Sequence, residues 1–406
     1  MSKIITDEKQ IEKVLTRGVE NVYPDKESLK NVLMSGKKLR IYNGIDPTGQ
    51  LHLGHGVVLR KLRQFQDLGH EVIVLIGDFT ATIGDPTDKL STRQPLSREQ
   101  VLNNAKDYKK LIGKILDTTK SNIRFLHNEK WTNKLKPADM LELASYFTVS
   151  RLLERDMFQE RIKAGKEIHV HEFLYPIFQA YDCVTMDVDM EIGGNDQTFN
   201  MLAGRTLMKK MKNKEKFVLT MKLLEDPTGK KMGKSEGNAI TLVDSPADMY
   251  GKIMSWPDER IMPSFEILTD ISEETLLEVK DQLALGLVNP RDIKMKLAYE
   301  AVKIYLGGKA AEEAEENFKR VFQEHQKPVE IPEVRINKDK LNKGKIGVLD
   351  LFVLAGLANS NNEMRRLIKE GAIKINDELI NSIDLRVEIK EEMILQRGKK
   401  QFVKLK

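Results

Sequence analysis

The stretch Ile41-Tyr42-Asn43-Gly44-Ile45-Asp46-Pro47-Thr48-Gly49-Gln50-Leu51-His52-Leu53-Gly54-His55 decides the fold. An apolar-leaning run leads into it, and a proline and a glycine within it end that run. Apolar residues then recur at helical spacing as far as Gly69, a typical helix stop. The next apolar run, at 72–76, predicts a second strand. Together they predict a strand–helix–strand unit with a right-handed parallel crossover, whose ligand site lies at the carboxyl end of the first strand.

Two histidines, His52 and His55, lie at the predicted helix start. The partial positive charge of a helix N-terminus favours a bound phosphate there, and Gly54 allows a base or backbone to approach closely. Two histidines around a glycine are, by themselves, more typical of surface or capping histidines than of a phosphate site.

A second segment, Lys231-Met232-Gly233-Lys234-Ser235, follows the turn-forming residues Asp226-Pro227-Thr228-Gly229. Its two lysines could move onto a pyrophosphate as charge develops, although a solvated basic loop has the same composition. In this order, the two segments resemble the HIGH and KMSKS signatures of class I aminoacyl-tRNA synthetases. Gly233 stands where the family usually has serine, and both lysines are kept.

The residues between the signatures indicate the amino acid. In the segment Phe173 to Asp182, Tyr175, Gln179 and Asp182 share one helix face, which could also be a solvated surface. The segment resembles the tyrosine pocket of tyrosyl-tRNA synthetases. The resemblance implies that Tyr175 and Gln179 hold the substrate ammonium, and that Asp182 and Tyr42 read the phenolic hydroxyl.

Tryptophan is the nearer rival substrate. A tryptophan enzyme needs a partner for an indole N–H and a wider pocket, whereas Tyr42 and Asp182 match the tyrosine pattern on two separate segments. Pro176 disfavours helical geometry at Tyr175, so we expect the helix to begin only there.

The resemblance implies further contacts along the chain. Asp85 is a third ammonium ligand, while Lys89 and Arg93 lie on a loop reaching the ATP phosphates unless that loop is merely a solvated charged one. Gly193-Gly194-Asn195-Asp196-Gln197 ends a predicted strand where a ribose is commonly held. There the family implies that Gly194 and Asp196 hold the ribose and that Gln197 contacts the reacting carboxylate.

The expected site divides into three sets. The catalytic set is Thr48, His52, His55, Lys231, Lys234, Lys89 and Arg93. The tyrosine-binding set is Tyr42, Gly44, Asp85, Tyr175, Gln179, Asp182 and Gln197. The ATP-binding set is Asp46, Gly54, His55, Gly194, Asp196 and Lys234.

Composition excludes several classes of protein. The 406 residues are enough for two or three domains, and no apolar run approaches a membrane span. The first residues lack the apolar core of a signal peptide. The single cysteine, Cys183, excludes an intramolecular disulfide and a cysteine-cluster zinc site, fits a reducing cytoplasm, and is expected to be a small buried filler.

The net charge is only +5, but it is unevenly spread. The stretch 205–234 is strongly basic and could track an RNA acceptor stem or be a solvated helix face. Its clustered lysines are Lys209, Lys210, Lys212, Lys214 and Lys216.

Beyond the second signature the pattern becomes helical. Asn289-Pro290 begins a helix that Gly307-Gly308 ends, and an acidic helix follows. Residues 256–325 resemble the α-helical domain that contacts the anticodon arm in tyrosyl enzymes. Residues 327–345, with two prolines and little apolar periodicity, are expected to be a linker.

The last segment has its own motifs. Ser360-Asn361-Asn362-Glu363 predicts a capping box, and Asn376-Asp377 predicts a turn between two short strands. The segment resembles the S4 RNA-binding domain, which meets folded RNA through phosphates and shape. The implied RNA contacts are Arg365, Arg366, Lys369 and Lys374.

The resemblance covers nearly the whole chain. The chain most resembles the bacterial subtype with KMSKS-like loops. It implies a Rossmann-like α/β catalytic domain at 1–235, a helical domain at 236–326, a linker at 327–345 and an S4-like α+β domain at 346–406. The implied substrates are L-tyrosine, ATP with Mg²⁺ and tRNA(Tyr). A cytoplasmic homodimer is expected, with no membrane partner and no protein metal site.

Two other classes remain open. Small-molecule nucleotidyltransferases share a His-x-Gly-His helix start, but they do not explain an S4-like tail. A non-catalytic RNA-binding protein on a synthetase scaffold explains the tail, but it should have lost the signature histidines and lysines.

Overall fold

The computed structural model describes residues 3–85, 96–226, 232, 239–323, 331–336, 345–398 and 401–406. The chain divides into two compact units, residues 1–308 and 309–406. Residues 239–308, from the expected helical domain, therefore pack within the first unit.

The opening stretch forms the centre of the first unit. It comprises strand β2 (Arg40–Ile45), helix α3 (Leu53–Asp67) and strand β3 (Glu71–Ile76). The two strands pair in parallel, which confirms the predicted strand–helix–strand unit. Gly69 follows the helix with φ of +96°, a left-handed conformation that glycine adopts without strain.

The sheet of the first unit has the order β1-β6-β5-β2-β3-β4. Its other strands are β1 (Val19–Tyr23), β4 (Ile123–His127), β5 (Met190–Gly194) and β6 (Phe217–Met221). All pair in parallel except β1, which runs antiparallel to β6. The arrangement confirms the Rossmann-like α/β prediction.

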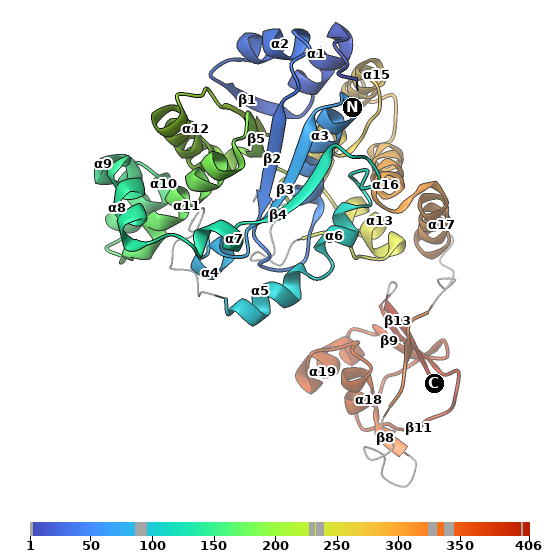
Figure 1. Ribbon diagram of the computed structural model, residues 1–406. Coiled ribbons are helices and arrows are strands. Elements are labelled where there is room, and N and C mark those ends of the chain that lie inside the picture. Colours follow the sequence, from blue (N-terminus) through green and yellow to red (C-terminus); the bar gives the residue numbers. More distant parts are fainter. Residues whose placement is uncertain are drawn as a thin grey trace. The chain divides into compact units, whose positions relative to one another are not determined.

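The direction of the crossovers reverses between β2 and β5. Helix α3 connects β2 to β3, whereas helix α12 (Thr198–Lys212) connects β5 to β6 in the opposite sense. Right-handed crossovers of opposite direction put these helices on opposite faces of the sheet (Figure 1). The crevice at such a switch point, outside the carboxyl ends of β2 and β5, is where open α/β sheets bind ligands.

Helix α11 (Val170–Met186) packs along α12 and begins before Pro176. The prediction that it begins only at Pro176 is wrong. The backbone N–H of His169 donates to Glu172 at 2.9 Å, and Arg161 forms a buried ion pair with Glu172 at 2.6 Å. This tertiary pair and the cap stabilise a first turn that outweighs the local preference against it.

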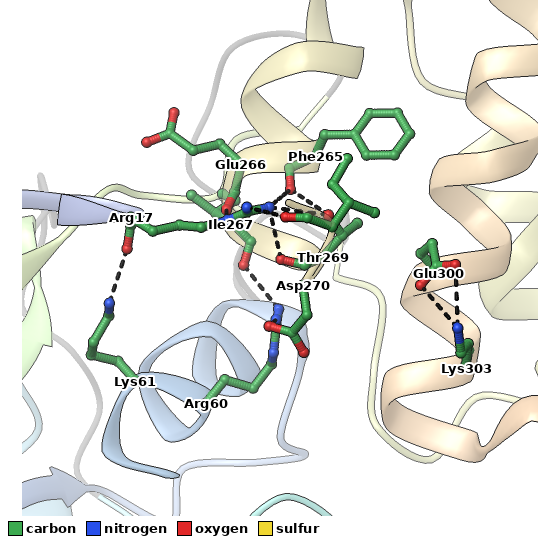
Figure 2. A network of polar contacts seen from close by, with 11 residues as sticks. Arg17, Arg60, Lys61, Phe265, Glu266, Ile267, Thr269, Asp270, Glu300 and Lys303 are labelled. Atoms are coloured by element: carbon green, nitrogen blue, oxygen red, sulfur yellow. Dashed lines mark hydrogen bonds and ion pairs between the residues drawn. The ribbon is translucent and has the colours of Figure 1, made fainter. Parts of the chain in front are cut away.

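Helix α3 is tied to the helical part of the unit through arginines (Figure 2). Arg60 of α3 donates to the Ile267 carbonyl at 3.1 Å and pairs with Asp270. Arg17, which follows α1 (Glu8–Thr16), donates to carbonyls at the end of α14 (Ile261–Leu268). Those carbonyls belong to Phe265, Glu266, Thr269 and Ile271. Cations at a helix C-terminus satisfy its open carbonyls and its dipole.

Lys61 of α3 makes a similar contact with the C-terminal end of α1. It is 2% exposed, and its Nζ donates to the carbonyls of Val14 at 2.7 Å and Arg17 at 3.0 Å. Burial and the neighbouring Arg60 and Arg17 lower the pKa of Lys61 to about 7. The helix that begins at His52 is therefore anchored to both α1 and α14.

The remaining helices of the first unit surround this core. They are α2 (Lys26–Met34), α4 (Thr80–Ile83), α5 (Arg98–Ala105), α6 (Tyr108–Ile112), α7 (Glu129–Thr132), α8 (Pro137–Ser145), α9 (Val149–Leu153), α10 (Asp156–Lys163), α13 (Pro246–Met254), α15 (Glu273–Ala284) and α16 (Pro290–Leu306). Helix α16 has Asn289 as its N-cap and ends before Gly307, as predicted. Across the described ranges of both units, no helix has the length and apolar character needed to cross a membrane.

The second unit combines short helices with small sheets. Its helices are α17 (Gly308–Phe318), α18 (Val348–Leu354) and α19 (Asn361–Lys369). Its main sheet has the order β10-β9-β12-β13-β7, and β8 pairs with β11. These strands are β7 (Glu333–Val334), β8 (Lys345–Gly347), β9 (Ile373–Ile375), β10 (Glu378–Leu379), β11 (Arg386–Glu388), β12 (Ile394–Arg397) and β13 (Gln401–Leu405).

In the second unit, one prediction from the sequence is confirmed and another differs from the structure. Asn376 and Asp377 have φ of +47° and +71° and join β9 to β10, which confirms the predicted turn. Glu333 and Val334, from the expected linker, instead pair in parallel with β13. The Lys404 N–H donates to the Pro332 carbonyl at 2.8 Å and the Lys406 N–H to the Val334 carbonyl at 3.1 Å, so backbone pairing with a strand distant in sequence adds this segment to the sheet.

Candidate active site

A pocket of about 610 Å³ lies at the carboxyl ends of β2 and β5. Every predicted catalytic, tyrosine-binding or ATP-binding residue within the described ranges lines it. These residues are Tyr42, Gly44, Asp46, Thr48, His52, Gly54, His55, Asp85, Tyr175, Gln179, Asp182, Gly194, Asp196 and Gln197. The fold therefore brings together segments that are up to 155 residues apart in the sequence (42 to 197).

The two histidines cap the start of α3. Nδ1 of His52 accepts from the Gly54 N–H, and Nδ1 of His55 accepts from the His52 N–H, both at 3.2 Å. Because Nδ1 is the acceptor in each ring, the neutral ring carries its proton on Nε2 and can donate from there. A Cβ on Gly54 would lie 3.0 Å from the His52 ring, a tight contact that glycine avoids. The histidines are thus capping residues whose neutral rings carry a hydrogen on Nε2, the type of donor that a phosphate accepts.

The turn before them is held from α5 and α6. Asn104 donates to the Pro47 carbonyl at 2.8 Å, and the Tyr108 hydroxyl donates to the Gly49 carbonyl. Burial raises the pKa of Tyr108, so it remains a donor. The Thr48 N–H donates to the Asp46 carbonyl at 2.7 Å. Nothing in the local sequence of Asn104 or Tyr108 pointed to this role.

Asp46 links the turn to α11. Its Oδ2 accepts from the Tyr175 hydroxyl at 2.9 Å, and its Oδ1 accepts from the Thr80 hydroxyl at 2.7 Å. A Cβ on Gly77 would lie 2.1 Å from the same carboxylate, so this close packing requires glycine. Burial and the nearby Asp46 raise the pKa of Tyr175 well above its usual value.

Asp182 is buried on α11 between two donors that sequence reasoning missed. Trp131 donates from Nε1 to Oδ1 at 2.7 Å, and Asn128 donates from Nδ2 to Oδ2 at 3.2 Å. Burial raises the pKa of Asp182 to about 8, although both donors oppose that rise. Neither donor lies in a recognisable motif.

Tyr42 was expected to act with Asp182, but its hydroxyl lies 3.0 Å from Sγ of Cys183. Burial raises the pKa of Tyr42 well above its usual value and raises the pKa of Cys183 to about 12. Cys183 is buried, as expected, and it is also a polar contact of the pocket wall.

Asp85 and Gln197 meet across the pocket. The amide of Gln197 donates to Asp85 at 2.7 Å, and Arg155, buried on the far side, lies 3.6 Å from the same carboxylate. A Cβ on Gly194 would lie 2.4 Å from an Asp196 oxygen, so glycine allows that aspartate to sit against the strand end. Arg155 was not found from the sequence.

Met232 of the second signature and the segment that follows that signature both lie near the first signature. The Met232 N–H donates to the Leu224 carbonyl at 2.7 Å, and Met232 lines the pocket. Leu53 donates to the Ile240 carbonyl at 2.9 Å, directly after His52. The catalytic candidates Lys231, Lys234, Lys89 and Arg93 lie outside the described residues.

The basic candidates differ in exposure. Lys216 is fully buried, so the expectation that it belongs to a basic surface is wrong; Glu191 pairs with it inside the unit. In the second unit Arg365, Arg366 and Lys369 are exposed on α19, and Lys374 is partly exposed on β9. The described residues contain no cluster of three or more histidine, cysteine or acidic side chains that could hold a metal ion.

Comparisons with known proteins agree with this geometry. Residues 34–323 match the family described as tRNA synthetases class I (W and Y), and residues 325–405 match the tyrosine–tRNA ligase SYY-like C-terminal domain. The chain is 45% identical to the tyrosine–tRNA ligase of Carboxydothermus hydrogenoformans, covering 97% of this chain and 96% of that one. It is 44% identical to the tyrosine–tRNA ligase of Thermotoga maritima, covering 99% and 98%.

Solved structures resemble the fold. A truncated mitochondrial tyrosyl-tRNA synthetase from Coccidioides posadasii aligns with a TM-score of 0.62 at 23% identity, covering 76% of this chain and 91% of that one. The tyrosyl-tRNA synthetase of Archaeoglobus fulgidus, solved with L-tyrosine, aligns with a TM-score of 0.60 at 22% identity, covering 76% and 99%.

Proposed function

The chain belongs to the class I tyrosyl-tRNA synthetase family and carries tyrosine–tRNA ligase activity, and we propose how its pocket residues divide that reaction. The enzyme activates L-tyrosine with ATP to tyrosyl-adenylate and pyrophosphate, and it then transfers tyrosine to the terminal adenosine of tRNA(Tyr). The observation that carries the residue assignment is the convergence of both binding sets on one pocket at the switch point.

Tyr175, Gln179 and Asp85 bind the substrate ammonium. An ammonium only donates, so each ligand must offer an acceptor. Because the Tyr175 hydroxyl gives its hydrogen to Asp46, its oxygen can accept from the substrate. Asp85 supplies a carboxylate beside them, with Arg155 and Gln197 limiting its movement.

Asp182 reads the phenolic hydroxyl. Trp131 and Asn128 orient its two oxygens, and burial makes an unmatched ligand costly. Phenylalanine lacks the hydroxyl and leaves this polar group unpaired. Tyrosyl-tRNA synthetases are themselves the established example of such discrimination, which reaches about 10⁵ against phenylalanine. Tyr42 contributes from β2 through the hydroxyl that also contacts Cys183.

ATP binds along the start of α3. The Nε2 donors of His52 and His55 and the nearby Thr48 stabilise charge on the phosphates, and Lys231 and Lys234 do so from the second signature. Lys89 and Arg93 assist from a separate segment. Gly194 and Asp196 hold the ribose.

The carboxylate of tyrosine attacks the α-phosphate in line. This carboxylate has no proton to lose, so neither histidine needs to act as a base.

Mg²⁺ accompanies ATP as the counterion of its phosphates. When bound, it supplies positive charge against the pyrophosphate.

The second unit binds RNA. Arg365, Arg366 and Lys369 project from one helix, and Lys374 lies on the following strand, which gives a basic face for phosphates of folded RNA.

The protein acts as a homodimer in the cytoplasm. Leu141, Val149, Ile162 and Val170 are exposed apolar side chains on α8, α9, α10 and the start of α11, which lie together in Figure 1. Exposed apolar side chains on neighbouring helices, a group called here the apolar patch, are typical of a protein–protein interface. The single, buried thiol of Cys183 suits a reducing compartment.

A tyrosine-dependent ATP–pyrophosphate exchange assay tests the proposal. Exchange with tyrosine, and little with tryptophan or phenylalanine, is the expected result. Exchange that prefers tryptophan would overturn the roles given to Asp182 and Tyr42.

A further inference from the structure

A buried ion pair lies behind the wall that carries Gln179. Lys216, just before β6, is fully buried, and its Nζ contacts Oε2 of Glu191 on β5. The same Nζ donates to the Met201 carbonyl at 2.9 Å. Glu191 is 2% exposed and lines the pocket.

The fold makes room for this pair. A Cβ on Gly204 of α12 would lie 2.7 Å from Nζ of Lys216 and 2.6 Å from Sγ of Cys183. Removing two charges from water is expensive, and a buried pair often contributes little net stability. The pair therefore calls for an explanation other than stability.

A further contact of Glu191, with Gln179, supplies such an explanation. Oε1 of Glu191 accepts from Nε2 of Gln179 at 2.9 Å. A carboxylate can only accept, so the amide nitrogen of Gln179 must face Glu191 and the amide oxygen is turned away from it. A substrate ammonium needs that oxygen. A glutamine with no such neighbour could present either end of its amide.

We infer that Glu191, held by Lys216, is a positioning residue for tyrosine recognition that fixes Gln179 with its oxygen toward the substrate ammonium. The inference rests on the proposed role of Gln179 as an ammonium ligand. It assigns to Glu191 and Lys216 an indirect role, through Gln179, in the affinity for the amino group.

The substitution Glu191→Gln reverses this geometry. Lys216 must then take the amide oxygen of the new glutamine, which leaves that residue's nitrogen facing Gln179. Gln179 accepts with its own oxygen and presents its nitrogen to the pocket. A donor then faces the substrate ammonium.

The test measures binding of L-tyrosine and of 3-(4-hydroxyphenyl)propanoate, which lacks the amino group, by calorimetry on the full-length protein. We expect Glu191→Gln to weaken tyrosine binding by roughly 10- to 100-fold, the range for a hydrogen bond to a charged group. Binding of the analogue should change little. Partial unfolding lowers the active fraction equally for both ligands, so the affinity ratio reports recognition and not folding.

Two further variants sharpen the result. Glu215→Gln removes the ion pair of the exposed Glu215 with the half-buried Arg205 and serves as the matched control, with an unchanged ratio. The exchange Gln179→Glu with Glu191→Gln keeps one carboxylate and one ammonium in the cluster and should recover the preference for tyrosine. If the single variant does not fold, this exchanged variant carries the test, and loss of the preference in it would overturn the inference.

Gln179→Ala separates this inference from the assignment beneath it. If Gln179→Ala lowers the ratio while Glu191→Gln leaves it unchanged, Glu191 has no positioning role. If Gln179→Ala itself leaves the ratio unchanged, Gln179 is not an ammonium ligand, and both statements fail.

Discussion

The hydroxyl of Tyr175 donates to Oδ2 of Asp46 across 2.9 Å, which joins helix α11 to the turn that precedes the signature histidines. The bond crosses from the tyrosine-binding set to the ATP-binding set. It also decides what Tyr175 can offer a ligand, because a hydroxyl whose hydrogen is used presents only lone pairs. An ammonium ligand is the natural complement.

Tyr175→Phe removes that acceptor while keeping the aromatic packing. We expect KM for tyrosine in the exchange assay to rise roughly 10- to 100-fold, the cost of one hydrogen bond to a charged group. KM for ATP should stay within a small factor of its original value. Equal increases in both constants would show that the Asp46 contact, and not the ammonium contact, dominates.

If Asp182 reads the phenolic hydroxyl as proposed, tyrosine recognition should depend on pH. Burial raises its pKa to about 8, so the free protein holds this carboxyl protonated at pH 7. A phenolic O–H donates best to the ionised form, so tyrosine binding should release a proton and strengthen as pH rises from 6 to 8. The limiting slope is about tenfold per pH unit.

Phenylalanine is the control ligand for this experiment, since it shares the ammonium and carboxylate of tyrosine. Calorimetry should show the tyrosine-to-phenylalanine affinity ratio rising with pH in the original protein and flat in Asp182→Asn. A flat ratio in both proteins would remove Asp182 from hydroxyl recognition.

The buried Lys61 should make the free energy of unfolding of the protein depend on pH. Burial lowers its folded pKa to about 7, against an ordinary value of 10.5, so the unfolded chain binds the proton more tightly. The free energy of unfolding should therefore rise with pH between 7 and 10.5, by at most about 1.4 kcal/mol per pH unit from this group. Lys61→Met should lose that component.

The measurement uses urea unfolding followed by tryptophan fluorescence at several pH values. Trp131 and Trp256 both lie in the unit 1–308, so the signal reports that unit. Parallel pH profiles for the two proteins would contradict a neutralised Lys61.

If the charge of Lys234 acts on the pyrophosphate in the transition state as proposed, Lys234→Ala should slow adenylate formation by roughly 100-fold or more in a single turnover. Tyrosine affinity should be unchanged. Lys210→Ala, on α12, is the control and should retain the rate. Equal losses in rate and tyrosine affinity for Lys234→Ala would count against the assignment.

Val149→Lys places a charge in the exposed apolar patch on α8 to α11. Light scattering should show the mass of the full-length protein falling from dimer to monomer at micromolar concentration. Leu287→Lys changes an equally exposed leucine outside that patch and should leave the dimer intact. A dimer that survives Val149→Lys would locate the interface elsewhere.

Much of the fold could be read from local patterns. The unit from β2 to β3 follows from apolar spacing and from a proline and a glycine that interrupt it. The limits of α16 follow from Asn289 and Gly307, and the turn at Asn376 follows from residues that tolerate positive φ. In each case the residues that determine the structure are neighbours in the chain.

The resemblance to known signatures extended this to the site. It predicted which residues of β2, α11 and β5 would face a ligand, and all of those that are described line one pocket. It did not predict what stands behind them. Trp131 and Asn128 behind Asp182, Glu191 behind Gln179 and the burial of Lys216 have no local signature.

The sequence by itself determined the periodic elements, their caps and the chemical types gathered at the first signature. Only the tertiary structure decided the partners of each polar side chain. Arg161 and Glu172 stabilise a start of α11 that the local sequence disfavours. Lys216, expected on a basic surface, is instead buried in an ion pair with Glu191. The physical reason is that desolvation and hydrogen bonding act between residues distant in sequence, and the order of the strands decides which of them meet.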